Sequence, residues 1–91
     1  MDKFEYLKII FYGGSGSEGK ITVVPTTNVD LVGFMQSWPK VILREEKYET
    51  YLAYPGFDPT IPVEFLDFLG RHGWEAYAVE GSSYYFKRKI G

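Results

Sequence analysis

Apolar and polar side chains alternate along the first segment of the chain, residues 4–12. A period of two with β-branched and aromatic side chains predicts a strand. Because both of its faces are largely apolar, we expect this strand to be central and covered, or to form part of an interface. One face carries Leu7, Ile9 and Phe11, and the other carries Phe4, Tyr6, Lys8, Ile10 and Tyr12.

A second strand is predicted over residues 20–24, where the side chains are mostly β-branched and Pro25 stops the pattern. The residues between the two strands, 13–19, are rich in glycine and serine, and we expect a flexible loop there. Two strands joined in this way predict an antiparallel hairpin with a long tip.

Two later stretches repeat apolar residues at helical spacing. The first follows possible capping residues at positions 26–28 and is ended by Pro39. The second follows Thr60, another capping residue, and ends at Gly73, which suits the left-handed position after a helix. Asp67 and Arg71 are spaced to pair on its outer face. The predicted inner residues are Leu31, Phe34, Met35 and Trp38 in the first helix, and Phe65, Leu66, Phe68, Leu69 and His72 in the second.

Residues 41–54 leave two interpretations open. Their β-branched and tyrosine content favours two strands on either side of the polar stretch 44–47. The same polar stretch also suits a helix. We predict strands.

The C-terminal residues predict a hairpin of two strands, 74–80 and 83–90, around a type II′ turn at Gly81-Ser82. This register opposes Val79 to Tyr84, Tyr77 to Phe86 and Glu75 to Arg88, and we expect these six residues on the core side. The other face then carries Trp74, Ala76, Ala78, Tyr85, Lys87 and Lys89.

These elements predict an α+β fold in which one or two α-helices pack on one face of an antiparallel β-sheet. With 91 residues, the chain forms a single domain, 1–91. We expect the first strand to lie beside the C-terminal hairpin. The chain has 8 Tyr, 7 Phe and 2 Trp, more rings than one small core needs, so a homo-oligomer is predicted, most simply a dimer.

The formal net charge of −2 excludes a global attraction to nucleic acid, so an anion site must be a local patch. Binding to duplex DNA is disfavoured for the same reason, and no recognition-helix pattern is present. The chain contains no cysteine, which rules out disulfides and thiolate metal sites. No apolar run is long enough to span a membrane, and no signal pattern is present, so a cytoplasmic location is expected.

Residues suited to catalysis are scarce. His72 is the single histidine, and its place at a helix end predicts a packing or capping role. Glu45, Glu46 and Glu49 predict a solvated turn rather than a metal site, because no other ligand type accompanies them. We therefore predict that the protein is not an enzyme, and that it has no catalytic residues, metal or cofactor.

Aromatic rings beside cations are the best candidate for a binding site. Stacking of a base on an aromatic ring contributes about 1–3 kcal/mol to binding, and a cation can pair with a phosphate. The prediction is sequestration of a small anionic, nucleotide-like ligand. The alternative is that these rings bury against another copy of the chain or another protein, without a small-molecule ligand. The candidate ligand-binding residues are Trp74, Tyr85, Lys87 and Lys89, with Arg71 and Arg88 near them.

Three segments carry a family resemblance: Phe4-Glu5-Tyr6-Leu7-Lys8-Ile9-Ile10, Leu69-Gly70-Arg71-His72-Gly73-Trp74-Glu75 and Tyr84-Tyr85-Phe86-Lys87-Arg88. Together they resemble a family of small bacterial and phage domains of unknown function. The resemblance covers the two ends of the chain and leaves residues 13–60 unmatched. It implies a compact α+β domain and no assigned activity. By analogy alone, phage membership suggests a protein that captures small host signals.

Overall fold

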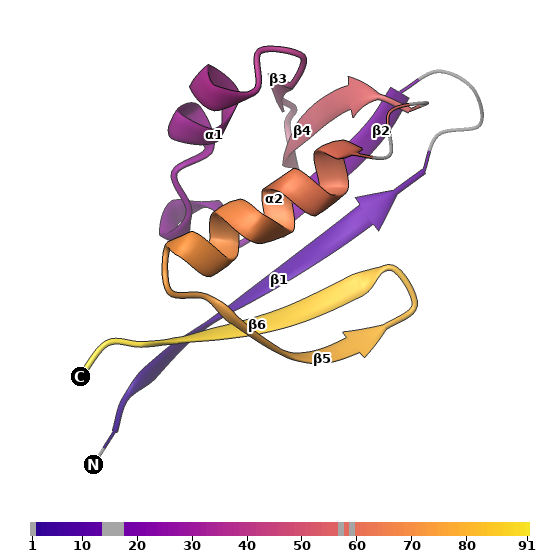
Figure 1. Ribbon diagram of the computed structural model, residues 1–91. Helices are drawn as coiled ribbons and strands as arrows, with labels where there is room; N and C mark the ends of the chain where they lie inside the picture. Colours follow the sequence, from indigo (N-terminus) through magenta and orange to yellow (C-terminus); the bar gives the residue numbers. More distant parts are fainter. Residues whose placement is uncertain (1, 14–17, 57, 59) are drawn as a thin grey trace.

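A computed structural model describes residues 2–13, 18–56, 58 and 60–91, and in these residues six strands and two α-helices are formed (Figure 1). The predicted α+β class, with an antiparallel sheet and helices on one face, is confirmed. In chain order the elements are β1 (Phe4–Tyr12), β2 (Glu18–Val24), a 3₁₀ turn (Thr26–Asn28), α1 (Leu31–Ser37), β3 (Ile42–Glu45), β4 (Thr50–Pro55), α2 (Thr60–Arg71), β5 (Glu75–Glu80) and β6 (Ser83–Lys89).

The strands form one sheet in the order β3-β4-β2-β1-β6-β5, and every neighbouring pair is antiparallel. β1 lies at the centre between β2 and β6, so Ile9 faces Val23 on one side and Tyr84 on the other. The predicted hairpin of β1 with β2 and the place of β1 beside the C-terminal hairpin are both confirmed. Two strands over residues 41–54 are confirmed as well, as β3 and β4.

One face of the sheet forms the hydrophobic core with the two helices, which lie on the same side of the sheet in Figure 1. An aromatic cluster joins the helices: the Phe34 ring lies 4.8 Å from Phe65 and 5.5 Å from Phe68. No described helix lies on the opposite face, which we call the helix-free face. The buried sheet residues include Leu7, Ile9, Ile21, Val23, Leu52, Tyr54 and Phe86.

The helix starts differ from the predicted caps. α1 is capped by Asp30, whose Oδ1 accepts a hydrogen bond of 2.8 Å from the Gly33 N–H, while positions 26–28 form the 3₁₀ turn. Thr60 is the first residue of α2 and donates its N–H to Asp58 Oδ1 at 3.0 Å. The Thr60 hydroxyl donates to the same oxygen, and the bonds from this hydroxyl and from the N–H lower the pKa of the Asp58 carboxyl, with a smaller effect of Lys40 in the same direction. Each carboxylate satisfies one of the free N–H groups at a helix start.

The predicted pair of Asp67 with Arg71 on α2 is confirmed. His72, predicted on the inner side of the helix, is exposed just beyond its end. In the predicted loop 13–19, residues 14–17 lie outside the described part of the chain, and Glu18 and Gly19 already belong to β2.

The register of the C-terminal hairpin departs from the prediction after its first pair. Gly81 has φ +59° and Val79 opposes Tyr84, as predicted. An irregularity between Ala76 and Ala78 then shifts the pairing. The predicted pairs of Tyr77 with Phe86 and of Glu75 with Arg88 are therefore wrong, because one extra residue in a strand moves every later residue by one position. The observed partners are Ala76 with Phe86 and Glu75 with Lys87.

Candidate functional site

The predicted site residues divide between the two faces of the sheet. Trp74 was predicted beside the lysines, but it is 4% exposed and belongs to the core on the helix side. The end of α2 explains this position. Trp74 N–H bonds to Leu69 O at 3.0 Å and Gly73 N–H to Gly70 O at 3.1 Å, with Gly73 at φ +87°. This Schellman arrangement folds the residue after the glycine back onto the last helical turn.

Arg88 also lies on the helix side, where it joins β6 to its neighbours. Its Nε donates to Glu5 Oε1 at 2.6 Å, and its Nη1 donates to the His72 carbonyl at 3.2 Å. Its guanidinium carbon lies 4.3 Å from the centroid of the Trp74 ring. A guanidinium that pairs with a carboxylate and stacks on a ring is already well satisfied. Arg88 is therefore part of the scaffold, although it was predicted to bind a ligand.

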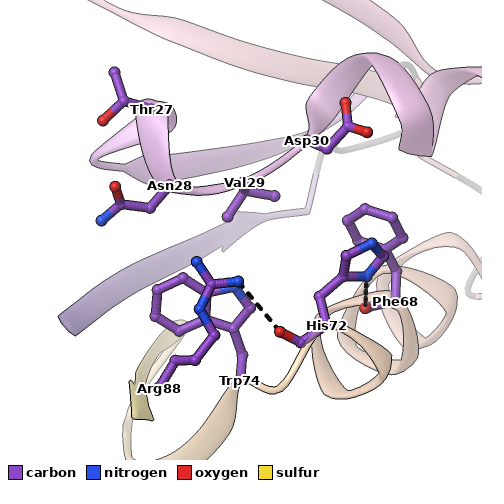
Figure 2. A pocket seen from close by; sticks show the side chains of 8 residues that line it. All are labelled: Thr27, Asn28, Val29, Asp30, Phe68, His72, Trp74 and Arg88. Atoms are coloured by element: carbon purple, nitrogen blue, oxygen red, sulfur yellow. Dashed lines mark hydrogen bonds between the residues drawn. The ribbon is translucent and has the colours of Figure 1, made fainter. Parts of the chain in front are cut away.

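A pocket of about 320 Å³ adjoins this arrangement (Figure 2). Figure 2 places Arg88 along the Trp74 ring, with the chain segment 27–30 on the opposite wall. His72 Nδ1 lies 2.9 Å from Phe68 O, and a carbonyl can only accept, so Nδ1 carries the proton. The lining residues are Thr27, Asn28, Val29, Asp30, Phe68, His72, Trp74 and Arg88.

The electrostatics of this pocket do not favour an anion. Its one arginine is neutralised by Glu5, and Asp30 adds a carboxylate. The pocket thus offers more acceptors than charged donors, and it does not match the anionic ligand predicted from the sequence.

The helix-free face carries the other candidate residues. Tyr85 is half-buried there, opposite Lys8 of β1 and Ala78 of β5. Lys8 Nζ lies 5.6 Å from the centroid of the Tyr85 ring, and the Tyr77 ring centroid lies 6.4 Å from that of Tyr85. Tyr6 meets Tyr77 edge to face at 6.0 Å. Three tyrosine rings from three neighbouring strands are thus brought together beside a lysine.

Lys87 extends this group. It faces Tyr6 on β1 and Glu75 on β5, and its Nζ lies 5.1 Å from the centroid of the Phe4 ring. We call the group formed by these residues the first ring cluster; it consists of Phe4, Tyr6, Lys8, Tyr77, Tyr85 and Lys87.

The cations of the first ring cluster differ from Lys20 and Lys89 in their pairing. Within the described part of the chain, neither Lys8 nor Lys87 forms an ion pair with a carboxylate within 4.0 Å. Glu75 lies across the strand from Lys87 without such a contact. Lys89, the next residue of this face on β6, pairs with Asp2 at 3.3 Å. Two lysines beside exposed rings are therefore available to an anion.

The remaining predicted residue, Arg71, lies on the surface of α2 and pairs with Asp67, outside both groups. The structure thus brings Tyr85, Lys87 and Lys89 together on one face and separates them from Trp74, Arg88 and Arg71. It adds Tyr6, Lys8 and Tyr77, which were not among the predicted site residues. The alternation of β1 already placed Tyr6 and Lys8 on one face; the register of β1 with β6 was the missing information.

Groups of three or more potential metal-ligating side chains are absent from the residues that the structure describes. No helix among them is long and apolar enough to cross a membrane. Comparisons with protein-family models, curated proteins and solved structures found no match to this chain.

Proposed function

We propose that this protein binds and sequesters a small, ring-bearing anion of the nucleotide type, without catalysing a reaction. The observation that carries the proposal is the first ring cluster, where Tyr85 and its neighbouring rings lie beside Lys8 and Lys87 on the helix-free face. Sequestration needs a ring to stack on and a cation to pair with a phosphate, and both are present within one patch.

The energetics are adequate for a ligand of modest affinity. Stacking of one base on an aromatic side chain contributes about 1–3 kcal/mol. The charge of each lysine is carried on a flexible stem, so Lys8 can leave the Tyr85 ring and follow a phosphate while its methylenes stay in contact with the sheet. The half-buried position of Tyr85 and Lys87 reduces the freedom that they lose when a ligand binds.

Titration calorimetry against mono-, di- and cyclic nucleotides tests this proposal. We expect heat of binding with the unmodified protein, and a loss of affinity of about 5- to 150-fold in Tyr85→Leu, as one lost stacking interaction predicts. Lys87→Gln should weaken nucleotide binding and leave the weaker binding of the matching nucleoside unchanged, because a nucleoside has no phosphate.

The turn between β3 and β4 supplies a matched control. Lys47 Nζ lies 5.2 Å from the centroid of the Tyr48 ring, a similar lysine–tyrosine pair away from the cluster. Tyr48→Leu and Lys47→Gln should leave the affinity unchanged. Absence of heat with every nucleotide would reject the proposal. If sedimentation then shows a dimer that Tyr6→Ser or Tyr77→Ser dissociates, the face serves as a protein interface.

A further inference from the structure

A second group of rings and charge lies on the same helix-free face. Lys20 Nζ of β2 lies 5.2 Å from the centroid of the Tyr12 ring and 4.5 Å from that of the Tyr51 ring. Tyr12 faces Lys20 across the β1–β2 pair, and Tyr51 faces Thr22 across the β2–β4 pair. We call Tyr12, Lys20 and Tyr51 the second ring cluster.

The two clusters are joined by β1. Tyr6 of the first cluster and Tyr12 of the second lie six positions apart on this strand, which at about 3.3 Å per residue separates them by about 20 Å. Ile10, between them on the same face, lies beside Thr22 and Ser83. The side chains at these three positions are small or apolar, and the Glu49 carboxylate reaches Thr22 from the turn between β3 and β4.

The two clusters differ in whether their lysines form ion pairs with carboxylates. Lys20 pairs with Glu49, which raises the pKa of the lysine and keeps it protonated. Thr22 Oγ1 also donates to Glu49 Oε1, at 3.3 Å. The Tyr51 hydroxyl also donates to Glu46 Oε1, at 3.0 Å. The second cluster thus offers rings without unpaired positive charge, while Lys8 and Lys87 of the first cluster offer both rings and unpaired charge.

We propose that the occupant of the helix-free face is a single-stranded nucleic acid, whose phosphates pair with Lys8 and Lys87 and whose bases stack on both ring clusters. This inference rests on the proposed function and names its ligand class. A mononucleotide reaches one cluster, whereas about six stacked nucleotides at 3.4 Å each cover the 20 Å between them. Exposed rings on a sheet suit unpaired bases, because a duplex hides the faces of its bases.

Fluorescence anisotropy with labelled oligouridine and oligothymidine of two, four, six and eight nucleotides tests this inference. We expect affinity to rise at least about fivefold between two and six nucleotides, the gain of one further stacked base, and then to level off. With two phosphate contacts, the logarithm of the affinity should fall against the logarithm of the salt concentration with a slope of about −1.4.

Variants separate this inference from the proposed function. Tyr12→Leu with Tyr51→Leu should remove the gain with length and leave mononucleotide binding unchanged, whereas Tyr85→Leu should weaken both. Tyr48→Leu should change neither. A circular dichroism melt checks each variant, and Tyr12→Leu alone replaces the double variant if that one fails to fold, since Tyr12 is 48% exposed.

The outcomes are distinct. If a mononucleotide binds as tightly as the eight-nucleotide strands, or the double variant keeps the full affinity for them, the inference is wrong and the proposed function stands. If neither mononucleotides nor oligonucleotides bind, both are wrong. A dimer that is lost in the double variant would instead assign the second cluster to contact with another copy of the chain.

Discussion

Gly19 of β2 lies buried against the Tyr54 ring of β4, on the core side of the sheet. A Cβ atom at this position would overlap the ring. Burial of Tyr54 raises the pKa of its hydroxyl, so the ring stays neutral within the core. We expect Gly19→Ala to lower the free energy of unfolding by about 1–3 kcal/mol, as overpacking of a core does, because the ring must move. The urea midpoint of unfolding measures this change.

Gly70→Ala supplies the matched control. Gly70 is exposed near the end of α2, and nothing lies within 4 Å of a Cβ atom added there. Alanine is preferred to glycine inside a helix, so the free energy of unfolding of this variant should rise by up to about 1 kcal/mol. A neutral or stabilising Gly19→Ala would show that Tyr54 does not occupy the space above Gly19.

The packing of the connection between α2 and the C-terminal hairpin leads to a prediction about stability. Trp74 packs in the core beneath Arg88, and Arg88 is held by Glu5 of β1. Trp74→Phe should therefore lower the free energy of unfolding by about 0.5–3 kcal/mol and change nucleotide affinity by less than about twofold. Urea unfolding and calorimetry on the same protein test both parts. Lost binding with unchanged stability would move the ligand site to the pocket of Figure 2.

The elements differ in how far their sequence predicts them. The alternation in residues 4–12, the proline after Val24 and the turn at Gly81 were sufficient to predict β1, the end of β2 and the hairpin of β5 and β6. The irregularity between Ala76 and Ala78 left no such signal, because both residues are small and exposed and so neither favours one register over the other. That single extra residue moved Glu75 and Tyr77 of β5 from the predicted core side to the helix-free face, whereas Tyr84 and Phe86 of β6 kept their predicted side.

The candidate site was predictable in part for a related reason. Tyr85, Lys87 and Lys89 alternate along β6, so their common face followed from the sequence. Trp74 precedes β5, and its direction is set by the Schellman turn rather than by strand alternation. Gly73 was predicted at the left-handed position after α2, and the residue that follows it in this motif packs on the helix. Combining these two facts would have placed Trp74 in the core.

At the scale of the whole molecule, most of the aromatic residues that the structure describes fall into two sets. One set builds the core with the helices, and it includes Phe34, Phe65, Phe68, Trp74 and Phe86. The other set remains accessible on the helix-free face, where Tyr6 is 57% and Tyr77 is 51% exposed. The high aromatic content therefore does not by itself require an oligomer, because the core uses the first set and a ligand can use the second.

This division predicts that stability and binding can be changed independently. Phe34 is 0% exposed and contacts both Phe65 and Phe68. Phe34→Ala should therefore lower the free energy of unfolding by about 3–5 kcal/mol. Tyr6→Ala should lower the free energy of unfolding by less than about 1.5 kcal/mol, which is the contribution of one aromatic pair. The same substitution should weaken nucleotide binding. Urea unfolding at two protein concentrations tests this. If Tyr6→Ala costs as much as Phe34→Ala, and the unfolding midpoint rises with concentration, a second copy of the chain covers the helix-free face.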